Sequence, residues 1–132
     1  MKFVIAFVLT LISPLSLGAS ELMTPSEFER FVEGKTLHFS LNGKPYGAEQ
    51  FFAGRQTTWQ FTGDACVKGI WFPQGAQICF FYEGADQRQC WLFVQKDGKY
   101  FARSVNGADG LVLEMTEESD KPLQCPGPDV GV

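Results

Sequence analysis

The chain has 132 residues, with 15 acidic and 11 basic side chains and a formal net charge of −4. This acidity argues against binding to the phosphate backbone of nucleic acids and against docking on anionic membrane surfaces. The composition includes 13 Phe, 3 Trp and 3 Tyr, which supply enough apolar surface for the core of one domain.

Residues 1–20 have the layout of a secretory signal peptide. Lys2 gives a positive start, residues 3–12 are almost wholly apolar, and small residues close the segment near Gly18 and Ser20. The apolar run is shorter than the roughly 20 residues of a membrane span. We therefore expect a periplasmic or secreted protein, cleaved after Gly18 or Ser20, with no membrane span after removal of the signal.

A short helix is predicted within residues 21–34. Thr24 is a suitable N-cap, Pro25 suits the first helical position, and Glu27 completes a capping box. Gly34 ends the helix. So short a helix is unstable alone, so its apolar face must pack on the rest of the domain. That face carries Phe28, Phe31 and Val32.

Between residues 35 and 118 the apolar pattern has a period of two, which is typical of strands. The predicted strands are residues 36–41, 45–52, 55–61, 65–72, 76–82, 88–94, 99–105 and 111–115. Glycine recurs in the breaks, as tight hairpins require. We therefore predict an all-β fold: an antiparallel meander of about eight short strands, forming a small barrel or a curled sheet behind one N-terminal helix.

Alternation along these strands gathers aromatic side chains on one face, the predicted inside. They are Phe39, Tyr46, Phe52, Trp59, Phe61, Trp71, Phe80, Tyr82, Trp91 and Phe93. These side chains could line a cavity for a small apolar or flat ligand, or they could fill the core. A filled core is favoured, because ten large side chains would largely occupy so short a barrel. If a ligand binds, the candidate lining residues are Phe39, Trp59, Phe61, Trp71, Phe80, Tyr82 and Trp91.

The opposite face is not uniformly polar. By parity, an apolar patch on it comprises Ile70, Phe72, Phe81, Leu92 and Val94. A solvated patch of this size would invite association, so a cover is expected. The N-terminal helix and the C-terminal tail are the two candidates.

All four cysteines follow the predicted signal peptide, which indicates an oxidising compartment and two disulfides. Cys79 and Cys90 come nearly opposite each other if their strands form a hairpin. Cys66 would then pair with Cys125 and hold the Pro-rich residues 119–132 as an irregular strap. The rival connectivity is Cys66–Cys79 with Cys90–Cys125. The cysteine spacing matches no compact zinc motif, so we expect no metal and no cofactor.

The sequence contains no recognisable catalytic set. His38 is the only histidine, and on its predicted strand it points away from the core. A Ser–His–acid triad would have to use it. No phosphate-binding glycine loop occurs, because the glycines lie in hairpin turns. We therefore expect no catalytic residues and no enzymatic activity.

A pattern of glycine, aromatic and cysteine positions covers nearly the whole chain after the signal. It comprises Gly34–Leu37, Tyr46-Gly47, Trp59, Cys66, Gly69, Trp71, Ile78–Phe80, Tyr82-Glu83, Cys90-Trp91, Cys125 and Gly127-Pro128. In these positions residues 34–132 resemble a family of small exported proteins of Gram-negative bacteria with no established activity. More distantly, the eight-stranded plan is similar to lipocalin-like barrels, although Gly34-Lys35-Thr36 stands where their Gly-x-Trp signature is expected.

Three functional hypotheses follow. The first is an exported, disulfide-stabilised, non-enzymatic module, a monomer that binds an envelope protein or another unknown target. The second is a lipocalin-like carrier of a small apolar ligand, which the aromatic side chains of the predicted inner face favour. The third is a hydrolase-like enzyme that uses a carboxylate or His38.

Overall fold

The computed structural model describes residues 13–14 and 19–126. Most of the predicted signal peptide (residues 1–20) and the end of the predicted strap (residues 127–132) lie outside the described residues. Within the described ranges, no helix is long and apolar enough to cross a membrane.

The described residues form nine strands, one α-helix and one 3₁₀ turn. In chain order these are β1 (Glu21–Leu22), α1 (Pro25–Val32), β2 (Thr36–Leu41), β3 (Lys44–Phe51), η1 (Ala53–Arg55), β4 (Gln56–Phe61), β5 (Cys66–Gln74), β6 (Gln77–Tyr82), β7 (Gln89–Lys96), β8 (Lys99–Ser104) and β9 (Val112–Ser119). The eight predicted strands correspond to β2–β9, which confirms the all-β fold class.

The eight strands β2–β9 form a closed antiparallel barrel. Each pairs with the next along the chain, and β2 pairs with β9 to close the ring. The meander is therefore a barrel and not a curled sheet. Strand β1 was not predicted from the sequence. It pairs with Val94 and Gln95 of β7, beyond the stretch where β7 pairs with β6.

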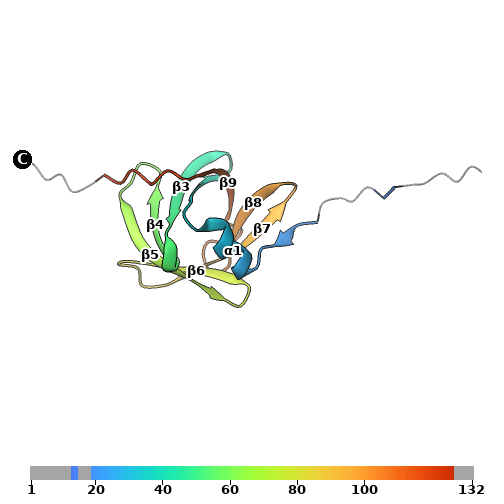
Figure 1. Cartoon of the computed structure of the whole chain (residues 1–132), viewed down its shortest axis with the longest axis horizontal. Helices are drawn as coiled ribbons and strands as arrows, with labels where there is room; N and C mark the ends of the chain where they lie inside the picture. The colour runs from blue at the N-terminus through green and yellow to red at the C-terminus, as the bar shows by residue number, and fades with distance from the viewer. Residues whose placement is uncertain (1–12, 15–18, 127–132) are drawn as a thin grey trace, which may run out of the picture.

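Helix α1 closes one end of the barrel, and Figure 1 shows the strands arranged around it. The Thr24 side chain accepts a hydrogen bond from the Glu27 backbone N–H, and the Glu27 carboxylate accepts one from the Thr24 backbone N–H, which confirms the capping box. Phe28 is 0% exposed. Its ring centroid lies 4.5 Å from that of Phe93, 5.2 Å from that of Trp71 and 5.7 Å from that of Phe51.

The prediction that the N-terminal helix covers the outer patch is therefore wrong. Phe28 packs on inward-facing aromatic rings, because the end of the barrel offers it a fully apolar site. The outer patch stays open around Ile70 and Phe81, which are paired across β5 and β6 and are 51% and 42% exposed.

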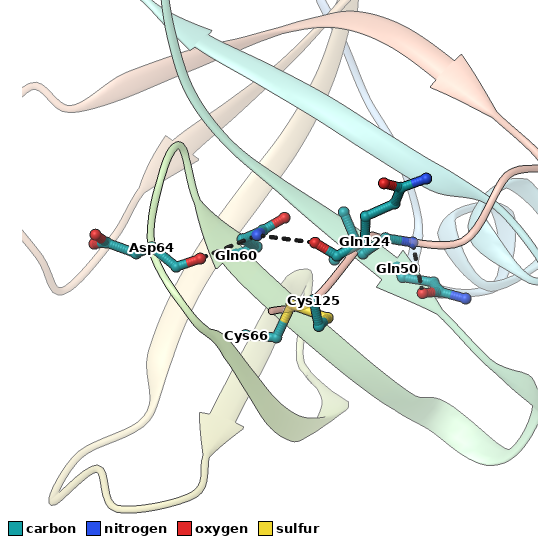
Figure 2. The surroundings of a disulfide bond; sticks show 7 residues. Gln50, Gln60, Asp64, Cys66, Gln124 and Cys125 are labelled. Carbon is teal, nitrogen blue, oxygen red and sulfur yellow. Dashed lines mark hydrogen bonds between the residues drawn. A yellow bond between two sulfur atoms is a disulfide. The ribbon is translucent and has the colours of Figure 1, made fainter. Parts of the chain in front are cut away.

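The C-terminal strap covers a different part of the outer face, over β2, β3 and β4. The Thr36 hydroxyl donates to the Lys121 carbonyl at 2.7 Å, and the Leu123 backbone N–H donates to the Gln50 side chain at 3.0 Å. Figure 2 shows the strap at Gln124 and Cys125, where Gln60 donates a hydrogen bond to the Gln124 carbonyl. Thr36 points outward but is buried, because the strap lies over it.

Two disulfides fix this arrangement. Cys66 is bonded to Cys125, and Cys79 is bonded to Cys90, its direct partner across β6 and β7. The favoured connectivity is confirmed and the rival is wrong. Two disulfides in one small domain indicate an oxidising, non-cytoplasmic environment.

Replacing Phe28 with alanine should lower the free energy of unfolding by about 3–5 kcal/mol, because it removes a buried ring and leaves a cavity at the end of the barrel. Urea denaturation followed by fluorescence measures this loss. Phe52→Ala is the matched control, since Phe52 is largely exposed and its loss should cost less than about 1 kcal/mol. Equal losses in the two variants would contradict the role assigned to Phe28.

Candidate functional site: an aromatic cavity with a buried carboxyl group

The barrel interior holds a cavity of about 290 Å³ in the half that α1 does not occupy. Six of the seven candidate lining residues border it: Phe39, Trp59, Phe61, Phe80, Tyr82 and Trp91. The seventh, Trp71, does not, because its ring packs edge-on against Phe28. Phe51 and Phe93 touch both Phe28 and the cavity, and so separate the filled end from the hollow one.

The favoured expectation of a filled core is therefore wrong for this half of the barrel. Gly47 and Gly69 point inward on β3 and β5, and aromatic rings lie directly against them. A Cβ atom at Gly47 would collide with the Trp59 ring, and one at Gly69 would lie 2.7 Å from Cδ1 of Tyr82. Because these rings lie along the wall and do not project across the barrel, the centre stays open.

A register shift in β3 changes which of its side chains face the cavity. Phe39 pairs with Gly47, but the next residue of β2, Ser40, pairs with Pro45, so Tyr46 is an extra residue in the ladder. Beyond this bulge the odd-numbered residues Glu49 and Phe51 point inward. The prediction that Phe52 faces inward is wrong, since its side chain lies on the outer face and is 42% exposed.

Glu49 is a candidate functional residue that the sequence pattern missed. Its side chain lines the cavity and is only 3% exposed. The Tyr82 hydroxyl donates a hydrogen bond to Oε2 at 2.9 Å. The other oxygen, Oε1, is buried and has no hydrogen-bond partner among the described residues. Strict alternation from Tyr46 would place Glu49 outside, where acidic residues usually lie.

Burial controls the protonation of this pair. It raises the pKa of Glu49 well above its ordinary value, and the hydrogen bond from Tyr82 opposes only part of that rise. The pKa of Tyr82 is also raised well above its ordinary value, first by burial and then by the neighbouring Glu49. Among the described residues, no Lys, Arg or His lines the cavity, so none of their cationic side chains compensates Glu49.

The cavity opens at the end of the barrel opposite α1. Phe61 stands at the opening and is 44% exposed, with its ring 5.5 Å from that of Tyr46. The loop after β6 contributes Glu83, Gly84 and Ala85 to the lining, so the opening carries a second acidic residue.

The other features that could carry a function lie outside the cavity. His38 sits on the outer face of β2, opposite Ala48 of β3, and does not reach the cavity. In the part of the chain that the structure describes, no group of three or more His, Cys, Asp or Glu side chains is placed to hold a metal ion. A separate, open hollow lies on the outer face and includes Phe52, Ile70 and Phe81.

Comparisons with protein-family models, with curated proteins and with solved structures each find no match to this chain. The candidate site therefore rests on its geometry and chemistry.

The Glu49→Gln substitution should change how stability depends on pH. Because the pKa of Glu49 is higher in the folded state than in the unfolded state, the folded state binds this proton more tightly. The protonated Glu49 therefore stabilises the fold at low pH, and this stabilisation is lost as pH rises from about 4.5 through the raised native pKa. Urea denaturation between about pH 4 and pH 8 should show the wild-type protein losing stability relative to Glu49→Gln as pH increases. A difference that does not vary with pH would contradict the burial effect.

Proposed function

We propose that this chain is an exported, non-enzymatic binding protein whose barrel holds a small ligand with an apolar body the size of one or two aromatic rings. The observation that supports this most directly is the cavity of about 290 Å³ bordered by nine aromatic side chains. Ligand pockets typically begin near 300 Å³, so a long lipid would not fit. The proposal thus favours the carrier hypothesis over the interaction module.

Location and rigidity support the same proposal. Residues 1–20 have the layout of a signal peptide, and the two disulfides indicate an oxidising compartment. We propose the periplasm or the extracellular medium as the location, in line with the resemblance to small exported proteins of Gram-negative bacteria. A barrel braced across its outer face loses little conformational freedom when a ligand enters, which favours binding.

Binding is proposed in preference to catalysis because Glu49 is the one member of the Glu49–Tyr82 pair that could act as an acid or base. The raised pKa of Tyr82 keeps its phenol protonated at neutral pH. General acid–base chemistry commonly needs a second group with a matched pKa at the same site.

Nuclear magnetic resonance of the indole N–H groups tests the proposal, with the neutral probe 2-naphthol. The resonances of Trp59 and Trp91 should shift on titration, since both side chains line the cavity, whereas Trp71 should shift little because it lies against Phe28. Ala102→Phe, which places a ring in the cavity, should abolish the shifts. Unmoved Trp59 and Trp91 resonances at millimolar probe would contradict a ligand-binding barrel.

A second candidate function is binding of a protein partner, and the outer hollow is the observation that favours it. Phe52, Ile70 and Phe81 are exposed together there, with Lys68 among the neighbouring residues. Exposed apolar surface of this kind often marks an interaction site. Ile70→Asp should then abolish capture of a specific protein from periplasmic extract while leaving the 2-naphthol shifts intact. Capture that is equal for the two forms would rule this surface out.

A further inference from the structure

The carboxyl group of Glu49 is an unusual component for a cavity built of aromatic rings. Removing a carboxylate from water costs several kcal/mol unless a cation or several hydrogen bonds compensate it. Tyr82 supplies one hydrogen bond, to Oε2. Oε1 receives none among the described residues, and no basic side chain lines the cavity. A purely apolar ligand would leave Oε1 buried without a hydrogen bond.

The rings around Glu49 favour a cation. Trp59 is the cross-strand partner of Glu49, and its ring lies 6.0 Å from that of Tyr46 and 6.3 Å from that of Phe39. The faces of such rings carry negative electrostatic potential and attract ammonium groups, most strongly when water is excluded. Glu83 at the opening adds a negative charge on the path of entry.

We infer that the cavity binds a protonated organic amine with an aromatic body, whose ammonium group donates a hydrogen bond to Oε1 of Glu49 while its ring packs among Trp59, Phe39 and Tyr46. This inference rests on the proposed function and names its ligand class. Tyr82 acts as a positioning residue, because its hydrogen bond holds Oε2 and leaves Oε1 available to the ligand.

Binding of this ligand is coupled to the release of a proton from Glu49. In the empty cavity the Glu49 carboxyl keeps its proton to higher pH than an ordinary carboxyl group does, because burial raises its pKa. The ammonium group favours the carboxylate, so Glu49 releases one proton to solvent as the amine binds. The other titratable groups that line the cavity are Tyr82 of β6, Tyr46 of β3 and Glu83 of the loop after β6. The cross-strand neighbours of Glu49, Leu37 and Trp59, do not titrate.

Isothermal titration calorimetry with a matched pair of probes tests the inference. 2-Phenylethylammonium and 2-phenylethanol share a ring and differ in the charged group. The amine should bind the wild-type protein about tenfold more tightly than the alcohol, or better. Glu49→Gln should weaken amine binding about tenfold or more and change alcohol binding by less than about threefold, because the amide cannot pair with a cation. Glu114→Gln on the outer face is the matched control and should change neither affinity.

A second measurement uses the wild-type protein alone. Titrations in two buffers of different ionisation enthalpy should reveal proton release on amine binding near pH 6 and none on alcohol binding. Equal affinities for the two probes, or amine binding that Glu49→Gln leaves unchanged, would overturn the inference and leave the proposed function standing. Failure of both probes to bind, with unmoved indole resonances, would overturn both.

Discussion

The insertion of Phe28 into the end of the barrel organises the rest of the interior. A barrel of eight short strands encloses space for side chains along its whole length. Phe28 meets Phe51, Trp71 and Phe93 at one end and fills that half. A solid hydrophobic core therefore occupies only part of the barrel, and it supports the rings that form the floor of the cavity. The filled core and the open cavity thus lie at opposite ends of a single sheet.

Glycine on the inner face maintains the hollow half. Where Gly47 and Gly69 leave room, the rings of Trp59 and Tyr82 lie flat along the wall. The same placement brings the Tyr82 hydroxyl to Glu49. Small residues therefore create both the open volume and the hydrogen bond that orients its one buried acidic group.

Much of the fold follows from the sequence. Period-two alternation and glycine-containing turns are local signals, so the eight strands of the barrel lie close to their predicted bounds. Strand parity and the hairpin geometry of Cys79 and Cys90 favoured the connectivity that the structure has, although they left one rival open. Strand β1 has two residues and exists only because β7 offers an open edge, which no local pattern records.

The site was less predictable, because it depends on two non-local features. The bulge at Tyr46 reverses which residues face inward along the rest of β3. Phe51 therefore faces the interior in place of Phe52, and Glu49 also lies inside. The open volume depends on how rings of one strand lie against glycines of the next, a property of the assembled sheet. Six of the seven candidate lining residues nevertheless border the cavity, since the other strands keep their alternation.

The pairing of Thr36 with Ser119 has a consequence for how the chain reaches its final form. Synthesis from the N-terminus produces β2 first among the strands of the ring and β9 last. The ring cannot close until the last strand has emerged, and Cys66 must wait still longer for Cys125. Cys79 and Cys90 are 11 residues apart in one hairpin and can oxidise before the ring is complete. The disulfide that ties down the strap is therefore the last one that can form.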